Sequence, residues 1–231
     1  MAVLECAGLS KSYGAVKALE DIDLKVEPGR VVGLLGPNGS GKTTLIKLAN
    51  GLLQPSAGRI LVCGREPGPE TKAEVSYMPE RLEMPEWTRV CRLADFFADF
   101  YADFDRARAA ELLERLGIDG ESRLRQLSKG LRQKVQLSLV MGRRAKLYLL
   151  DEPFGGMDPA SRDLMLETVL QSRAPEAAVV ISTHIITDVE RVLDDVVFLD
   201  RGGVRLCSPA AELRAREGKS VDELFREVFR C

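Results

Sequence analysis

The segment GPNGSGKT, residues 36–43, matches the pattern G-x-x-x-x-G-K-[ST] without a gap. Glycines at these positions let backbone N–H groups turn towards phosphate oxygens, and the start of the following helix adds positive charge. Lys42 adds a full positive charge, and the hydroxyl of Thr43 is placed to bind Mg²⁺. The sequence therefore predicts a nucleoside triphosphate site. Its expected contact residues are Gly36, Pro37, Asn38, Gly39, Ser40, Gly41, Lys42, Thr43 and Thr44.

Two carboxylates stand where such a loop would need them. Asp151 and Glu152 follow the apolar-leaning run LYLL, which predicts a buried strand. The carboxyl ends of strands in an α/β sheet lie beside the phosphate loop. Asp151 therefore suits a Mg²⁺ ligand, direct or through water, and Glu152 can polarise an attacking water molecule. Acidic pairs at strand ends are common, so this pair indicates a functional site only in combination with the phosphate loop.

His184 is the only histidine in the chain. It follows the apolar run AVVIS, so it stands at the sheet edge where phosphates are expected. Most single histidines are incidental, but a histidine at this edge can supply a hydrogen-bond donor near pH 7. Its position therefore favours a role in the chemistry.

The elements that must position these residues alternate between strands and helices. Strands are expected at residues 31–35, 146–151, 178–182 and 195–200, and helices at 42–53, 159–173 and 184–195. This alternation predicts an α/β fold of the P-loop type, with a mostly parallel core sheet covered on both faces.

Two regions depart from that alternation. Residues 1–30 and 58–77 predict an antiparallel β extension, and residues 88–142 predict an inserted helical segment. Aromatic residues recur in this segment at three- and four-residue spacings, which favours core packing over contact with a partner. They are Phe96, Phe97, Phe100, Tyr101 and Phe104.

The composition is that of a globular protein, with 45% hydrophobic and 29% charged residues. A net charge of −2 gives no electrostatic argument for a nucleic acid or an anionic lipid as a direct partner. No apolar run approaches the roughly 18 to 20 residues of a membrane span, and no secretion signal is expected. The five cysteines form no CxxC pair, which favours free thiols.

The segment LSKGLRQKVQLSLVMGRRAKLYLLDEPFGGMDP resembles the signature motif and Walker B region of the ATP-binding-cassette (ABC) ATPases. The resemblance extends from LSKSYG near the N-terminus to VVFLDRGGV. It implies an ATP hydrolase that uses ATP and Mg²⁺. In the family, a histidine placed as His184 is hydrogen-bonded to the γ-phosphate and helps to hold the water-activating glutamate. The resemblance therefore implies Lys42, Glu152 and His184 as catalytic residues.

The resemblance also assigns roles outside the loop. The signature segment comprises Leu127, Ser128, Lys129 and Gly130, and in the family it clasps the γ-phosphate held by the opposite subunit. Lys129 stands where the family usually has a second glycine, and the usual glutamine after Gly130 is a leucine here. On the structural alternative, Ser128 is a plain helix cap.

Two further residues match family positions. Tyr13 corresponds to the aromatic residue that stacks on adenine, with a core or surface tyrosine as the alternative. Asp158 lies in the D-loop, which couples the two active sites of a dimer in the family. A cap residue before Pro159 is also a standard helix opening.

Glu80 departs from the family in charge. A lid glutamine that contacts Mg²⁺ normally follows the sequence Y-x-P, whereas Glu80 follows Tyr77-Met78-Pro79 here. A carboxylate oxygen can still contact Mg²⁺, although it adds negative charge beside the triphosphate. We expect Glu80 to fill the glutamine's role and exchange for glutamine to retain most activity. The expected Mg²⁺ ligands are Thr43, Glu80 and Asp151.

The resemblance implies one ABC ATPase domain over residues 1–231, with a helical subdomain at about 86–142 and a C-terminal helical tail at about 209–231. Two subunits, identical or related, would sandwich two ATP molecules. Integral membrane permease subunits, separately encoded, would carry the substrate and bind the helical subdomain. We therefore expect a peripheral subunit on the cytoplasmic face of the cell membrane, with no nucleic acid partner.

The sequence most resembles bacterial export-type cassettes of drug or peptide-antibiotic efflux systems. Two alternatives stay open from the sequence alone: a soluble ABC ATPase, for example one in Fe–S assembly, and a nucleotide-dependent regulator with little hydrolysis. The intact Lys42, Asp151, Glu152 and His184 argue against the regulator.

Overall fold

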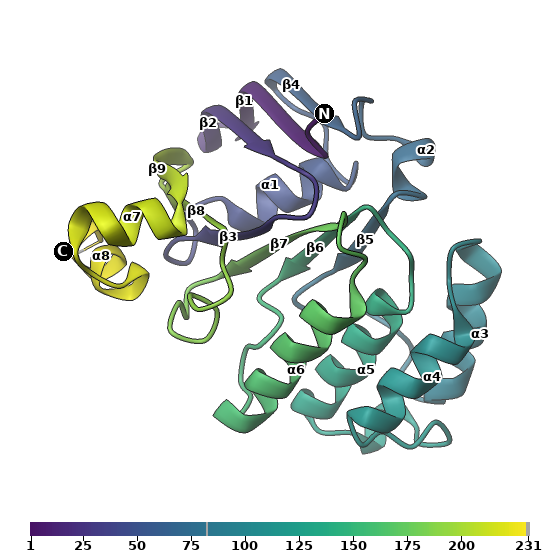
Figure 1. Cartoon of the computed structure of the whole chain (residues 1–231). Coiled ribbons are helices and arrows are strands. Elements are labelled where there is room, and N and C mark those ends of the chain that lie inside the picture. Colours follow the sequence, from purple (N-terminus) through teal and green to yellow (C-terminus); the bar gives the residue numbers. More distant parts are fainter. Residues whose placement is uncertain (82, 230–231) are drawn as a thin grey trace.

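The computed structural model describes residues 1–81 and 83–229, and a six-stranded sheet lies at its centre (Figure 1). The strand order is β5-β6-β7-β3-β8-β9, and all neighbours are parallel except the antiparallel pair β8 and β9. Three of the inner strands, β6, β7 and β3, are buried on both faces, which is why they are nearly continuous apolar runs. The strands are β3 (Val31–Leu35), β5 (Val75–Met78), β6 (Leu147–Asp151), β7 (Ala178–Thr183), β8 (Asp195–Asp200) and β9 (Gly203–Pro209).

A separate antiparallel sheet covers one face of the molecule. It has the order β2-β1-β4, and helix α1 lies between it and the central sheet (Figure 1). One cluster of buried apolar side chains joins the two sheets and α1. Its elements are β1 (Leu4–Tyr13), β2 (Val16–Val26), α1 (Lys42–Ala49) and β4 (Ala57–Val62).

The predicted antiparallel extension is confirmed for β1, β2 and β4. The prediction is wrong at the end of residues 58–77, because β5 pairs in parallel with β6 in the central sheet. Val75, Ser76 and Met78 are buried there, and the hydroxyl of Ser76 donates to the carbonyl of Val140 at 2.8 Å. A short helix, α2 (Pro69–Lys72), precedes this strand.

Helices cover the other face of the central sheet, with α5 and α6 nearest to it and α3 and α4 farther out (Figure 1). The predicted helical segment is confirmed, although its clearest pattern is split in two. The chain leaves α3 at Tyr101, and the carboxylate of Asp105 accepts the N–H of Arg108 to begin α4. The helices are α3 (Val90–Phe100), α4 (Arg106–Arg115), the 3₁₀ turn η1 (Leu124–Gln126), α5 (Lys129–Met141) and α6 (Pro159–Ser172).

The core-packing prediction for the aromatic cluster is wrong for two of its members. Phe97 and Phe104 pack against the core, but Phe96 and Phe100 are 44% and 69% exposed. Helix α3 buries one stripe, which includes Val90 and Leu93, and the two exposed rings lie outside it.

The helix predicted at residues 184–195 is wrong, since this segment forms successive turns. Ile186, Val189 and Leu193 are buried, so their helix-like spacing serves packing of the turns on the core. Two hydrogen bonds between Asp194 and Val31 hold the end of this segment against the central sheet. The carboxylate of Asp194 accepts the N–H of Val31 at 2.8 Å, and the N–H of Asp194 donates to the carbonyl of Val31 at 2.9 Å.

The C-terminal part of the described chain is helical, as predicted, in α7 (Ala210–Glu217) and α8 (Val221–Val228). The rings of Phe225 and Phe229 pack against Phe198 of the central sheet, at centroid distances of 5.5 and 6.0 Å. Cys6, Cys63, Cys91 and Cys207 are free thiols, whereas Cys231 lies outside the described residues. Over residues 1–81 and 83–229, no helix combines the length and apolar character needed to cross a membrane.

Arg143 joins the helical segment to the edge of the central sheet. Its guanidinium is 2% exposed, pairs with Asp103, donates to the carbonyls of Lys72, Ala73 and Val75, and lies over the ring of Tyr101 at 3.9 Å. Arg143→Met leaves these acceptors unpaired in a buried place. We expect the free energy of unfolding to fall by about 3–5 kcal/mol in a denaturant titration.

Arg144→Met is the matched control, because Arg144 is 70% exposed and its ion pair with Asp105 lies at the surface. We expect a change within about 1 kcal/mol for this variant. Equal effects of the two substitutions would contradict the structural role given to Arg143.

Candidate active site

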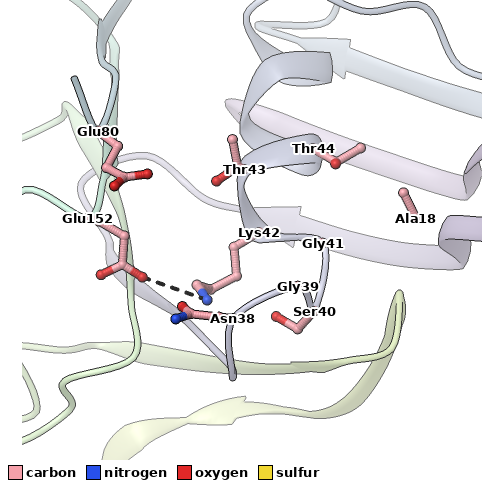
Figure 2. A pocket seen from close by; sticks show the side chains of 10 residues that line it. All are labelled: Ala18, Asn38, Gly39, Ser40, Gly41, Lys42, Thr43, Thr44, Glu80 and Glu152. Carbon is pink, nitrogen blue, oxygen red and sulfur yellow. Dashed lines mark ion pairs between the residues drawn. The ribbon is translucent and has the colours of Figure 1, made fainter. Parts of the chain in front are cut away.

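The phosphate loop lies between β3 and α1 and borders a hollow of about 340 Å³, the phosphate hollow (Figure 2). Glycine is required in the loop by close backbone contacts. A Cβ on Gly36 would lie 2.3 Å from the carbonyl oxygen of Leu199, and one on Gly41, which has φ +108°, would lie 2.6 Å from that of Ala18. The lining residues are Ala18, Asn38, Gly39, Ser40, Gly41, Lys42, Thr43, Thr44, Glu80 and Glu152.

Lys42 is the cation of this hollow, and only 6% of its side chain is exposed. Its ammonium donates to the carbonyls of Gly36 at 2.7 Å and Pro37 at 3.1 Å, and it lies 3.7 Å from Oε1 of Glu152. Burial lowers the pKa of Lys42, and the nearby charges of Glu152 and Asp151 oppose that shift. Gly36 and Pro37 do not line the hollow; they hold the lysine through their carbonyls.

Asp151 lies at the end of β6, 1% exposed, between the loop and β7. Its Oδ1 accepts from the hydroxyls of Ser182 at 2.5 Å and Thr43 at 3.2 Å. Its Oδ2 is buried, and no partner for it lies among the described residues. The hydroxyl of Thr43, the unpartnered oxygen of Asp151 and the carboxylate of Glu80, which lines the same hollow as Thr43, are oxygen donors of the kind that Mg²⁺ prefers. The residues present therefore fit a Mg²⁺ ion.

Glu152 and His184 form a contact pair at the rim. Nδ1 of His184 lies 3.0 Å from both carboxylate oxygens of Glu152, and an ionised carboxylate only accepts hydrogen bonds, so the ring donates from Nδ1. Glu152 has φ +47°, which is uncommon for a residue with a side chain and costs about 1–3 kcal/mol. Its carboxylate points towards Lys42 (Figure 2). Strain held at such a place is typical of a functional residue.

The signature residues lie elsewhere on the chain, at the start of α5. Ser128 accepts the N–H of Leu131 at 3.3 Å, and Asp158 accepts that of Ser161 at 3.0 Å, so both are helix caps. Acceptance of that N–H lowers the pKa of Asp158. Both caps border a hollow of about 410 Å³, the signature hollow, which shares no residue with the phosphate hollow. Its lining residues are Ser128, Lys129, Gly130, Leu131, Lys134, Gly156, Met157, Asp158 and Ser161.

The predicted adenine contact lies outside both hollows. Tyr13 ends β1, is 48% exposed and does not line the phosphate hollow. Two residues that sequence reasoning missed are Ala18, which lines it, and Ser182, which donates to Asp151 and accepts the N–H of Glu152 at 3.2 Å. The position of Ser182 two residues before His184 was the available signal.

This chain is similar to known proteins in sequence and in fold. A family model described as "ABC transporter" matches residues 19–155. The daunorubicin resistance ATP-binding protein DrrA3 of Streptomyces coeruleorubidus is 33% identical over 230 residues, which cover 96% of this chain and 73% of that protein. A solved structure of an ATP-binding subunit of an ABC transporter is 33% identical, covers 99% of this chain and 100% of its own, and has a TM-score of 0.89. A dimeric ATP-binding cassette bound to ADP and Pi shares the fold at 18% identity, with 89% of this chain and 98% of its own covered and a TM-score of 0.80.

Proposed function

Because the chain belongs to the ATP-binding subunits of ABC transporters, whose cassettes hydrolyse ATP, we propose that it does so at the phosphate hollow. The observation that carries the proposal is one set of contacts. Lys42, Glu152 and His184 come from three separate segments, and the carboxylate of Glu152 lies 3.7 Å from the ammonium of Lys42 and 3.0 Å from Nδ1 of His184. Glu152 and Lys42 line the same hollow as the glycine loop.

The proposed roles are supported by the geometry for Lys42, Glu152 and His184, and by the family resemblance for Tyr13. The loop amides and Lys42 hold the phosphates, and the lysine exchanges its carbonyl partners for phosphate oxygens. Glu152 orients a water molecule and accepts a proton from it as the water oxygen attacks the γ-phosphate. His184 fixes the carboxylate through Nδ1, and in its doubly protonated form the ring also donates from Nε2 to a phosphate oxygen. Tyr13 stacks on the adenine.

Thr43, Asp151 and Glu80 are the residues that would hold Mg²⁺. The ion, when bound, neutralises charge on the phosphate oxygens. The support for this part of the proposal is the unpartnered Oδ2 of Asp151, whose burial is unfavourable without a cation or a donor. Glu80 lies on the same hollow and points towards Thr43 (Figure 2).

Cassettes of this family form dimers and work with membrane permease subunits. For this chain we propose a head-to-tail dimer, with an identical or a related subunit, over residues 1–231 as one domain. The signature hollow shares no residue with the phosphate hollow of the same chain, so Ser128, Lys129 and Gly130 are available to a nucleotide held by the second subunit. The D-loop residue Asp158 borders the same surface.

The helical segment is the proposed contact with the permease, on the cytoplasmic face of the membrane. Phe96, Phe100 and Trp87 support this, because they are 44%, 69% and 68% exposed on or beside α3. The direction is proposed to be export, since the similar protein DrrA3 is named for daunorubicin resistance. Family membership disfavours the alternative of a soluble cassette unrelated to transport.

His184→Ala tests the proposed site. We expect ATP binding to stay measurable and turnover to fall by about 10²-fold or more, because Glu152 loses the hydrogen bond that fixes it. Calorimetric ATP titration measures binding, and phosphate release at saturating ATP and Mg²⁺ measures turnover. Near-normal turnover of His184→Ala would make the histidine incidental and contradict the assignment.

A further inference from the structure

A third hollow, of about 400 Å³, lies between the segment that follows β5 and helix α5; we name it the lid hollow. Glu80 lines both the lid hollow and the phosphate hollow, and Lys129 lines both the lid hollow and the signature hollow. A carboxylate and an ammonium therefore share one hollow, and each also faces a second one. The lining residues are Glu80, Arg81, Leu127, Lys129, Arg132, Gln133 and Gln136.

One residue that lines the lid hollow, Gln133, has a buried acceptor. Gln133 is 5% exposed, and its Oε1 is buried without a hydrogen-bond partner among the described residues. A buried amide oxygen is unfavourable until a donor reaches it. The neighbouring amide is already used, because Nε2 of Gln136 donates to the carbonyl of Pro79 at 2.6 Å. This second bond ties the base of the Glu80 segment to α5.

Two cations border the lid hollow with no ion pair among the described residues, Lys129 and Arg81. The third, Arg132, pairs with Glu86 at 2.9 Å and donates to the carbonyl of Leu127 at 3.2 Å. Lys129 lies one turn before Gln133 on the same helix, so the two side chains are neighbours on the helix surface.

Lys129 has space to move. Its Nζ lies 3.3 Å from the place where a Cβ on Gly156 would stand, so the side chain extends over a glycine that offers it no obstacle. Its residue is exposed, and four methylene groups let the ammonium swing from the signature hollow to the lid hollow.

We propose that Lys129 is a positioning residue for Glu80. Its ammonium enters the lid hollow, donates to Oε1 of Gln133, and attracts the carboxylate of Glu80 away from the phosphate hollow. Mg²⁺ and ATP compete for the same carboxylate and draw it back. The two departures in charge, at positions 80 and 129, thus act together. This inference rests on the proposed function, because it assumes that Mg²⁺ binds beside Thr43 and Asp151.

The test is the Mg²⁺ dependence of ATP binding by the full chain, measured by calorimetric titration at increasing Mg²⁺ concentrations. Lys129→Met frees Glu80, so we expect the Mg²⁺ concentration at half-maximal effect to fall by about fivefold, a typical coupling between two sites. Lys129→Arg keeps the charge and should match the wild type. Glu80→Gln should raise that concentration, and adding Lys129→Met to Glu80→Gln should change it no further.

Lys47→Met is the control, because Lys47 lies in the last turn of α1 and lines none of the three hollows. It should leave the Mg²⁺ dependence at the wild-type value. The proposal is overturned by an unchanged Mg²⁺ dependence in Lys129→Met, or by a shift that persists in the Glu80→Gln background. If the wild-type chain binds no ATP at all, the proposed function fails, and the inference fails with it.

Discussion

Glu152→Gln is expected to stop nearly all ATP turnover while ATP binding is retained. The amide has the same shape as the carboxylate but cannot accept a proton from the attacking water. Removal of a general base lowers kcat by about 10²–10⁴-fold. Binding is expected to persist because Lys42 keeps its place on the carbonyls of Gly36 and Pro37 and loses only a neighbouring negative charge. Phosphate release and equilibrium ATP binding, measured on one preparation, separate the two effects.

Glu167→Gln is the control for this experiment. Glu167 is an exposed glutamate on α6 that does not line the phosphate hollow. Its exchange should leave both turnover and binding unchanged. If Glu152→Gln retained turnover within about tenfold of the wild type, general-base catalysis by Glu152 would be ruled out, since that is less than such a base supplies.

Lys42→Met is expected to remove most of the affinity for ATP. The ammonium is the one lysine or arginine group that lines the phosphate hollow in the described residues, and it lies at the bottom of the glycine loop. Loss of a charged hydrogen-bond donor costs about 1.5–3 kcal/mol, which corresponds to a rise in Kd of about 10- to 150-fold. Turnover should fall with binding. Calorimetric titration with ATP measures the Kd directly.

Lys47→Met provides the comparison on the same helix. Lys47 lies in the last turn of α1 and does not line the phosphate hollow. Its variant should bind ATP as the wild type does. An unchanged Kd in Lys42→Met would place the nucleotide outside the glycine loop.

The phosphate loop and the acidic pair could be predicted from the sequence because their geometry is local. Residues 36–43 must form a tight loop between a strand and a helix, and the glycines allow one backbone path, as the contacts of Gly36 and Gly41 illustrate. The position of Asp151 follows from the end of a buried strand. The prediction for each used only a few neighbouring residues.

The sequence-based prediction was wrong where contacts between distant segments determine the structure. Residues 184–195 have helical spacing, yet the hydrogen bonds between Asp194 and Val31 turn the chain into β8 instead. The spacing of Phe96 and Phe100 is equally helical, but which face of α3 is buried depends on the helices beside it. The spacing of apolar residues indicates which of them share a face, but it does not indicate which neighbouring element packs against that face.

The lid hollow illustrates the same limit for the site. Glu80 and Lys129 are separated by 49 positions, and each is noticeable in the sequence only as an unusual charge. Their common hollow, and the unpartnered oxygen of Gln133 within it, arise from the packing of the segment after β5 on α5. The sequence therefore indicated that each of these two residues departs from the family, but it did not indicate that both line one hollow.

The central claim is that ATP is held and cleaved at the hollow formed by the glycine loop, Glu152 and His184. A structure of the Glu152→Gln variant with ATP and Mg²⁺ tests it most directly. We expect the triphosphate within hydrogen-bonding distance of Lys42 and the loop amides, with its γ-phosphate facing His184 and the metal ion beside Thr43 and Asp151. A triphosphate bound outside this hollow, or one that leaves Lys42 on the carbonyls of Gly36 and Pro37, would contradict it.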